Sequence, residues 1–298
     1  MNPRNIALLF AFLAALIYGV SYTVAKDVMP FYVKPYAFII LRVLGATILF
    51  WAIGIFVKKE KIDRQDYLRI FLAAIFGAAF NMLTFFKGLS LTSPISASVI
   101  MLTVPIVVLL LSTIILKEKV NLNKILGIAI GLVGAFVLIV YGQSVNSGEN
   151  PLLGNFLVFV NASLYSFYLI IVKRLIDKYH PLTFVKWIYT FGLLMVIPFG
   201  FSELQEVQWQ QMPTDILLKT GFIVVFTTFF TYLFNLFALT KLKPTTLSIF
   251  IYLQPVIATI YALITNSDTL SVVKILATVL IFMGVYMVTI VNKPKRIT

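Results

Sequence analysis

The segments Gly88–Pro105 (GLSLTSPISASVIMLTVP) and Ala238–Pro255 (ALTKLKPTTLSIFIYLQP) repeat one pattern at a distance of 150 residues. Each begins with a small residue and a leucine, and each carries two prolines eleven positions apart. Further matches appear at shifts of 150 or 147 residues, namely Glu118 with Asp268, Gly134 with Gly284 and Tyr18 with Tyr165. An internal repeat of this period predicts two similar units, 1–141 and 152–298, joined by a linker at 142–151.

Composition indicates that hydrocarbon is the solvent for most of the chain. Of its 298 residues 60% are apolar and only 12% are charged, with a mean hydropathy of +0.99. Soluble domains have roughly 45–50% apolar and about 25% charged residues, so a soluble fold is excluded. The chain has no cysteine and a single histidine, His180. Disulfide, thiolate and Cys-type metal chemistry are therefore also excluded, and we expect no cofactor and no metal.

Apolar stretches long enough to cross roughly 30 Å of hydrocarbon occur ten times. We expect all of them to be helices, because an unpaired backbone amide is costly in lipid. The expected spans are Ile6–Ala25, Tyr36–Val57, Leu68–Leu89, Ile95–Leu116, Leu122–Tyr141, Leu152–Val172, Leu182–Phe201, Ile216–Leu239, Thr245–Ile264 and Val272–Val291. Five spans in a unit is an odd number, so the second unit enters the membrane from the opposite side. The fold predicted is an all-α 5+5 inverted repeat, an arrangement typical of secondary transporters; the alternative is a duplicated scaffold without transport.

The net charge of +13 marks one face of the membrane. If the N-terminus is cytoplasmic, seventeen of the 24 Lys and Arg residues lie in inner segments and five lie in outer segments or helix ends. This bias predicts that both termini lie in the cytoplasm and the 142–151 linker on the opposite, periplasmic side. It also explains the basic charge without nucleic-acid binding.

With these features the chain resembles the EamA-type branch of the drug/metabolite transporter superfamily. The resemblance is carried by the duplicated five-helix unit, the proline pairs, the acid in the following turn and the glycine-rich closing helix. Tyr18-Gly19 stands where that family often has Trp-Gly, and Arg42 matches a common family position. Two departures are Asp268 in place of Glu and Ile188 in place of a second arginine. The resemblance implies a bacterial inner-membrane carrier, often an exporter, of amino acids and other small metabolites.

Polar side chains at helical spacing predict the walls of a central cavity, because polar groups inside a span usually face the bundle interior. The candidate substrate-binding residues are Tyr18, Ser21, Tyr22, Arg42, Asn81, Phe85, Ser98, Asn161, Tyr165, Tyr168, Thr231, Tyr232, Asn235, Ser248, Tyr252 and Gln254. The alternative for Ser, Thr and Asn is interhelical hydrogen bonding, and for the tyrosines an interfacial anchor. Pro105 and Pro255 lie inside spans, as hinges or as static kinks.

Charged and glycine positions leave further alternatives. Arg42 either joins Lys26 and Lys87 in a basic outer vestibule or extends to lipid headgroups. Gly127 and Gly131 form a GxxxG pattern that favours internal helix packing over dimerisation. No Asp or Glu lies within a span, so we expect no buried carboxylate relay and interpret Glu118 and Asp268 as caps of the following helix.

We therefore expect a carrier that works by alternating access and is not an enzyme. Its partners would be a small-molecule substrate and the lipid bilayer, and it would be a monomer or weak homodimer. The expected substrate is a small amphipathic metabolite such as an amino acid, with export favoured by the resemblance alone. Other possibilities are a carrier of a phosphorylated sugar, nucleotide or lipid intermediate, a non-transporting scaffold or sensor, and a channel.

Overall fold

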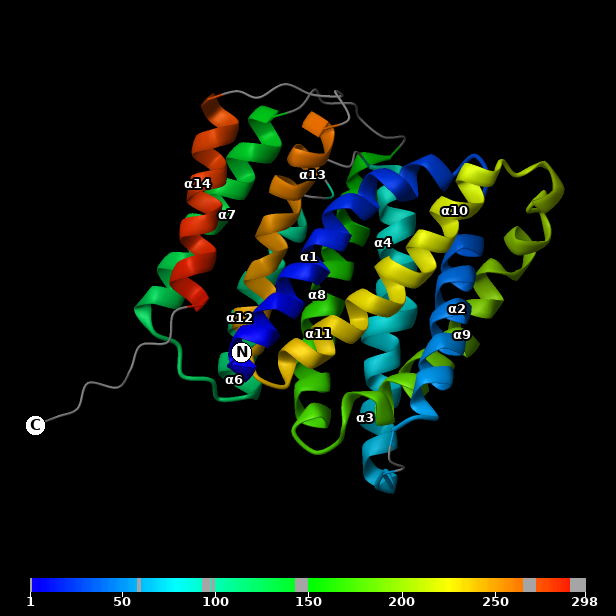
Figure 1. Cartoon of the computed structure of the whole chain (residues 1–298), viewed down its shortest axis with the longest axis horizontal. Coiled ribbons are helices and arrows are strands. Elements are labelled where there is room, and N and C mark those ends of the chain that lie inside the picture. Colours follow the sequence, from blue (N-terminus) through cyan, green and yellow to red (C-terminus); the bar gives the residue numbers. More distant parts are fainter. Residues whose placement is uncertain are drawn as a thin grey trace, which may run out of the picture.

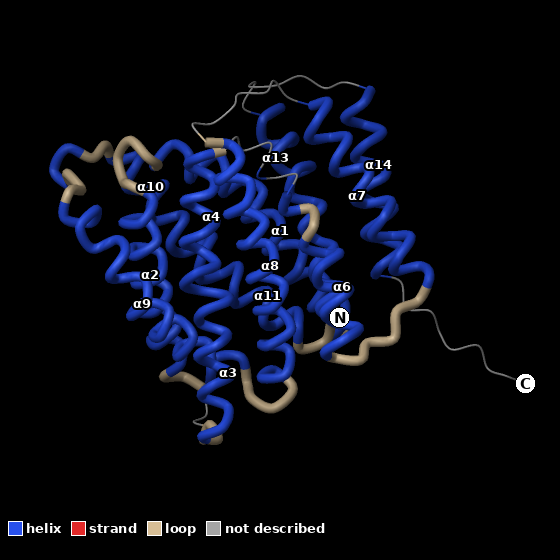
Figure 2. Tube along the Cα trace, turned by 180° about the vertical axis from the view of Figure 1, so that it is seen from behind, coloured by secondary structure: helices blue, strands red, loops and turns tan. Residues whose placement is uncertain are grey.

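A computed structural model describes residues 2–57, 60–92, 97, 100–142, 150–264 and 272–289. Within these ranges the regular structure is entirely helical (Figures 1 and 2). The elements are α1 Pro3–Val28, α2 Pro35–Gly54, α3 Arg64–Ala74, η1 Ile75–Ala79, α4 Phe80–Leu91, α6 Val104–Ile115, α7 Leu122–Gly142, α8 Pro151–Ile176, α9 Pro181–Gln205, η2 Trp209–Gln211, α10 Thr214–Phe222, η3 Ile223–Phe230, α11 Thr231–Leu239, α12 Pro244–Ser248, η4 Ile249–Tyr252, α13 Leu253–Ile264 and α14 Val272–Thr289.

Helix starts follow from local sequence. The helices α1, α2, α8, α9 and α12 each begin with a proline, whose missing N–H is not needed in the first turn. The side chains of Asn2 and Asn150 accept hydrogen bonds from the first turns of α1 and α8. These signals set the boundaries of the predicted spans to within a few residues.

Seven helices of the described chain are long and apolar enough to cross a membrane, and three shorter apolar helices accompany them. All the expected spans overlap one of these helices. Two calls fall partly outside the described residues, namely the start of the fourth span and the 142–151 linker, of which 143–149 are not described. The chain is therefore a multi-pass helical protein, while the count of ten spans stays a prediction.

Three of the spans depart from a regular α-helix. The continuous rods Arg64–Leu91 and Thr214–Leu239 each contain a π-helical stretch, η1 and η3, and the helix from Pro244 is interrupted by the 3₁₀ turn η4. Pro105 and Pro255 lie in the first turns of α6 and α13, so each proline is near the start of a helical segment rather than in its middle. A π turn takes up extra residues and changes which side chains share a face.

The two halves of the chain interlock. The main helix pairs each join the first half with the second: α2 runs along α9, α7 along α14, α4 packs on α8, and α1 packs on α11 (Figure 1). Glycines permit the closest of these approaches. A Cβ added to Gly127 would lie 2.8 Å from the carbonyl oxygen of Gly284, and one added to Gly131 would lie 2.6 Å from the Tyr252 ring. The GxxxG pattern thus packs inside the molecule, as predicted.

Carboxylates cap the paired helices α2 and α9 across the two halves. Glu203 Oε2 at the end of α9 accepts hydrogen bonds from the backbone N–H groups of Tyr36 and Ala37, at 2.8 and 3.1 Å. Glu60 Oε2 accepts from the backbone N–H of His180 and the hydroxyl of Thr183, at 2.9 and 2.6 Å. Each acid thereby meets the positive end of a helix from the other half, so this helix pair is held at both ends.

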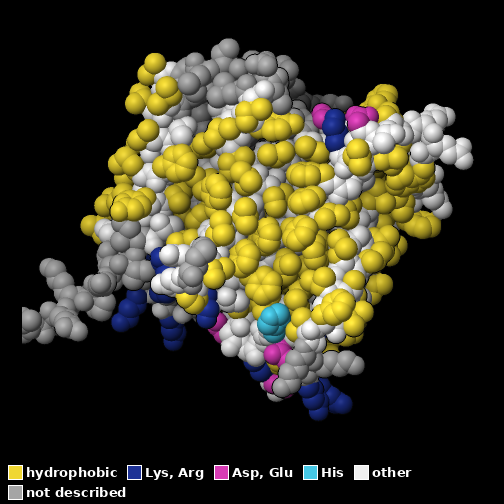
Figure 3. Space-filling view, viewed as in Figure 1, with side chains coloured by type: hydrophobic (Ala, Val, Ile, Leu, Met, Phe, Trp, Pro, Cys, Tyr) yellow, Lys and Arg dark blue, Asp and Glu magenta, His cyan; other side chains and the backbone are white. Residues whose placement is uncertain are grey.

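Charge marks one face of the molecule. The guanidinium of Arg4 at the start of α1 donates to the carbonyl oxygen of Thr289 at the end of α14, so both described ends of the chain lie on one face. We call this the terminal face and the opposite one the distal face. Lys and Arg side chains gather along the lower edge of Figure 3, below a broad apolar band, on the side where α1 begins.

Buried acids contradict the expectation that the chain offers no buried carboxylate. Asp66 is 1% exposed and Glu118 is 9% exposed, both near the terminal face. Asp66 accepts hydrogen bonds from Tyr179, Arg69 and Lys178. Lys178 also pairs with Asp63, and the hydrogen bonds that it donates to these two carboxylates, to Asp63 most of all, raise the pKa of Lys178. The acids do lie at helix ends, but the connectors fold over them.

Glu118 does not cap the next helix. It pairs instead with Lys124 and accepts a hydrogen bond of 2.6 Å from the hydroxyl of Thr245 at the start of α12. The side chain of Asn121 accepts from the backbone N–H of Lys124 and takes the capping position of α7. The ion pair therefore ties α12 to the turn that joins α6 and α7, and Asp268 lies outside the described residues.

Candidate functional site

A cavity lies between the halves and encloses about 800 Å³ of space, its open side included. Side chains from α1, α2, α4, α8, the η3–α11 rod and the η4–α13 segment line it. The lining residues are Tyr18, Ser21, Ala25, Arg42, Asn81, Met82, Phe85, Phe86, Leu89, Met101, Asn161, Tyr165, Ile223, Thr227, Tyr232, Ile251 and Gln254. It reaches toward the distal ends of α1 and α4, so we call it the distal chamber.

A smaller chamber, about 280 Å³ with its open side included, lies on the side of the terminal face. Its lining includes Ala11 and Ala15 of α1, Asn235 of α11 and Ser248 of α12. Four residues line both chambers, namely Tyr18, Tyr165, Ile251 and Gln254. Along α1, residues before Tyr18 line only this terminal chamber and residues after it line only the distal one. The shared residues therefore form a partition between the two chambers.

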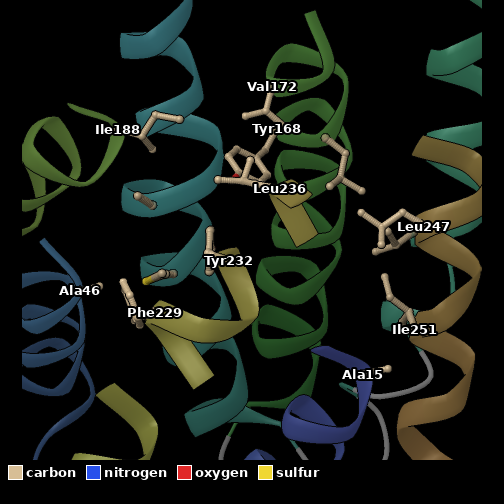
Figure 4. Packing of buried hydrophobic residues seen from close by; sticks show 14 of the residues in the cluster. Ala15, Ala46, Tyr168, Val172, Ile188, Phe229, Tyr232, Leu236, Leu247 and Ile251 are labelled. Carbon is tan, nitrogen blue, oxygen red and sulfur yellow. The ribbon is translucent and has the colours of Figure 1, made fainter. Parts of the chain in front are cut away.

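Tyrosines pack in a continuous cluster behind the partition. The rings of Tyr165 and Tyr168 stack at 6.0 Å, and Tyr232 lies 5.8 Å from Tyr168 and 5.3 Å from Tyr189. Figure 4 shows Tyr168 on α8 near Tyr232 on α11, within the buried apolar core. The hydroxyl of Tyr232 donates to the carbonyl oxygen of Gly77, at 2.5 Å, in the π turn η1. These rings hold the cavity wall in one arrangement.

Arg42 lies inside the bundle, which excludes the interpretation that it extends to lipid headgroups. Arg42 is only 5% exposed, and its side chain lines the distal chamber. The Nε atom donates to the hydroxyl of Thr228 at 2.9 Å, and the guanidinium carbon lies 4.7 Å from the Phe86 ring centroid. Lys87 is not among the lining residues, and the Lys26 side chain lies outside the described ones. Of the three residues of the predicted basic vestibule, the structure thus places Arg42 in the chamber wall.

The polar side chains of the cavity also cross-link helices. The amides of Asn81 and Asn161 each donate to the backbone carbonyl of the other residue, at 3.3 and 2.7 Å, and so join α4 to α8. The hydroxyls of Ser21 and Thr227 lie 2.6 Å apart between α1 and η3. For these residues both interpretations hold, because the same side chains line the cavity and bond neighbouring helices.

The structure brings nine of the predicted residues together around the distal chamber: Tyr18, Ser21, Arg42, Asn81, Phe85, Asn161, Tyr165, Tyr232 and Gln254. Asn235 and Ser248 line the terminal chamber instead. Tyr168, Thr231 and Tyr252 are buried and line neither. Ser98 and the side chain of Tyr22 lie outside the described residues. Their roles in binding stay predictions.

The sequence interpretation missed Thr227, Met82, Phe86 and Ile251 among the lining residues. Thr227 lies in the π stretch η3, where the helical spacing used to find the polar face does not apply. The others are apolar and give no signal of their own in a chain this hydrophobic. Ile251 and Met101 stand 150 residues apart, so the repeat relates two wall positions that polarity alone did not find.

Comparison with known proteins assigns this chain to a family. The family model described as the EamA-like transporter family matches residues 5–140 and again residues 152–290. The chain belongs to the EamA-like transporter family. The EamA-like chain is 28% identical to an uncharacterized transporter of Archaeoglobus fulgidus, over 93% of this chain and 96% of that one. It is 25% identical to the uncharacterized transporter YoaV of Bacillus subtilis, over 95% and 96% of the two chains.

A solved crystal structure has the same fold, with a TM-score of 0.77 over 96% of this EamA-like chain and 98% of that one. Its sequence identity is 16%, so it carries the fold alone. Together with the apolar helices, the family assigns this protein to multi-pass membrane transporters. Proteins of this kind take a small-molecule substrate and reside in a lipid bilayer.

Proposed function

We propose that this EamA-like protein is a secondary transporter that moves a small organic solute by alternating access. The observation that carries the proposal is the pair of chambers separated by a partition of Tyr18, Tyr165, Ile251 and Gln254. A solute held at the partition has one chamber on each side. Opening the two chambers in turn would pass it across the membrane without a continuous pore.

We also propose that the chain is a 5+5 inverted repeat, in which a two-fold axis relates the two halves. A two-fold axis requires that when one residue contacts a second, their mates contact each other too. The pairs α2–α9 and α7–α14 join equivalent helices, and α1–α11 is the mate of α8–α4. The hydroxyl of Tyr252 donates at 3.1 Å to the carbonyl oxygen of Leu102, which is 150 residues away in the chain.

Individual side chains repeat the same relation. Ser21 of the first half meets Thr227 of the second. Their mates, at shifts of 147 and 150 residues, are Tyr168 and Gly77, and a Cβ added to Gly77 would lie 2.1 Å from the Tyr168 ring. Tyr18 and Tyr165 are also mates, so the partition lies at the proposed axis. A two-fold rotation about an axis in the membrane plane would exchange the two chambers, so that either of them could be the open one.

The proposed setting is the inner membrane, with both termini in the cytoplasm. The basic side chains gathered on the terminal face support this orientation, because cytoplasmic segments are rich in Lys and Arg (Figure 3). The distal chamber then faces the periplasm. Export of a small amphipathic metabolite, such as an amino acid, is the direction and substrate class that the family resemblance favours.

The wall chemistry favours a carrier of small solutes over one of phosphorylated sugars or nucleotides. Arg42 is the one cation among the described residues of the chamber walls, and no acid lines either chamber within that part of the chain. Aromatic rings and amides supply stacking and oriented hydrogen bonds. Without a carboxylate in the path, we expect exchange or facilitated diffusion rather than coupling to a proton.

Counterflow in proteoliposomes tests the proposal. Vesicles that contain the protein and a high internal concentration of a metabolite should take up the labelled metabolite transiently above equilibrium. Tyr165→Ala should abolish this uptake by opening the partition, while Tyr286→Ala, on the exposed side of α14, should leave it unchanged. A channel would equilibrate the label without an overshoot. A scaffold would show no uptake with any metabolite, and either result would refute the proposal.

A further inference from the structure

The positive charge of Arg42 has no counterion in the described protein. None of the ion pairs among the described residues involves it, although its residue is only 5% exposed. A buried charge without a partner is strongly unfavourable, so proteins pair such charges or use them for a ligand. Contact with the Phe86 ring attracts the cation but does not neutralise it.

The donors of Arg42 are arranged for an external anion. The Nε–H is used by the hydroxyl of Thr228, which itself donates at 2.9 Å to the carbonyl oxygen of Ile223 and is thereby held in place. The two terminal nitrogens have no hydrogen-bond partner among the described residues, and the side chain lines the distal chamber. A fixed guanidinium with free terminal N–H groups matches the two oxygens of a carboxylate.

The rest of the described chamber wall offers no carboxylate to a positive group on the same ligand. Its described polar side chains are hydroxyls and amides, which offer dipoles but no formal negative charge. An ammonium group bound there would lie in a buried site near Arg42 and would be repelled by it. The remaining wall is apolar or aromatic, with Met82, Phe85 and Met101 among its members.

We propose that the substrate is an organic monocarboxylate with an apolar or aromatic body and no ammonium group, bound through its carboxylate to Arg42. This inference rests on the proposed transport function and narrows its substrate class. It departs from the amino-acid expectation, because a zwitterion brings a second, positive charge close to Arg42, and no carboxylate among the described wall residues pairs with it. It also excludes doubly charged phosphate esters, since one guanidinium neutralises one charge.

Three probes with similar carbon skeletons separate the charge types: 3-phenylpropionate with one negative charge, L-phenylalanine as a zwitterion, and phenethylamine with one positive charge. Binding is read from ligand-dependent thermal stabilisation of the purified protein, and transport from counterflow. We expect 3-phenylpropionate to stabilise the protein and to exchange, with an affinity at least about tenfold above the other two. Equal or stronger binding of phenylalanine or the amine, or no binding of the carboxylate, would overturn the inference.

The two proposals fail in distinguishable ways. If the carboxylate binds but does not exchange, the anion site stands and the transport function is wrong. If phenylalanine exchanges and 3-phenylpropionate does not, transport stands and the anion inference is wrong. Both readouts use the wild-type protein, so neither depends on the folding of a variant.

Substitution of Arg42 tests whether this residue binds the carboxylate. Arg42→Gln should reduce the affinity for 3-phenylpropionate roughly 30-fold or more, because a hydrogen-bonded charge pair is lost. The ligand-free variant should melt no lower than the wild type, since an unpaired buried charge is removed. Arg64→Gln, the same change at an exposed arginine, should alter neither. A lower melting temperature with unchanged affinity would give Arg42 a structural role and refute the proposal.

Discussion

The contact between Gly77 and Tyr168 predicts that a methyl group added at Gly77 disturbs the whole tyrosine cluster behind the partition. Gly77 lies in the π turn η1, and a Cβ built on it would be 2.1 Å from Cδ2 of the Tyr168 ring. The Tyr168 ring is fully buried, stacks on Tyr165 and lies beside Tyr232. In Gly77→Ala the ring has to move, and its neighbours leave little room for it.

The size of the effect follows from this distance. Real Cβ contacts essentially never fall below 3.0 Å, so the ring or the helix has to shift by about 1 Å. Overpacking of a closely filled core costs about 1–3 kcal/mol. The shift also strains the hydrogen bond from the Tyr232 hydroxyl to the carbonyl oxygen of Gly77. We expect Gly77→Ala to lower the free energy of unfolding by about 2 kcal/mol and to slow counterflow through the displaced Tyr165.

Thermal unfolding in detergent and counterflow in vesicles measure the two effects. Gly221→Ala is the matched control, because a Cβ there meets nothing within 4 Å and alanine favours a helix by up to about 1 kcal/mol. Tyr168→Leu should reduce the cost of Gly77→Ala by making space, which a double-mutant cycle detects. If Gly77→Ala and Gly221→Ala melt alike, the close packing of Tyr168 on η1 does not exist as described.

Other features give predictions of the same kind. Glu118→Ala should destabilise the protein by about 3 kcal/mol in thermal unfolding, because the largely buried Lys124 ammonium loses its ion-pair partner and keeps only the hydroxyl of Thr245. Adding Lys124→Met should restore part of the loss. Asn161→Ala should cost about 0.5–1.5 kcal/mol, because the hydrogen bond from α8 to the carbonyl oxygen of Asn81 is lost while the hydroxyl of Thr84 still donates to that oxygen. An unchanged stability would contradict the reciprocal amide pair. Single cysteines at Phe31 and Lys61, in a chain with no other cysteine, should react with an impermeant reagent from opposite sides of the membrane; labelling from one side would refute the orientation.

The sequence was sufficient to predict the helical membrane architecture. A lipid-facing helix must be apolar over its whole length, so the spans are visible without knowledge of their partners. The proline pairs and Tyr18–Tyr165 revealed the repeat, and helical spacing found most of the distal chamber wall. Polar residues are rare in these spans, so each one that faces the interior stands out.

What the sequence did not predict depends on departures from regular geometry and on distant contacts. The π stretches η1 and η3 change the helical register, which hid Thr227 and placed Thr231 behind the wall rather than in it. Burial of Asp66 depends on Lys178 and Tyr179, more than a hundred residues away. The sequence did not predict whether the Arg42 side chain points to the lipid or to the interior, because a lipid headgroup and an interior ligand can both bind a guanidinium. The hydrogen bond to Thr228 shows that it points to the interior.

The interlocking of the halves has a consequence for how the molecule assembles. All four main helix pairs join residues before the 142–151 connector with residues after it, so a half made alone loses most of its close helix packing and the hydrogen bonds between helices. The halves are therefore obligate partners rather than independently folding units. A gene cut within the connector should yield two fragments that are degraded when made singly but reconstitute a functional transporter when made together. Accumulation of either lone fragment as a folded species would contradict this.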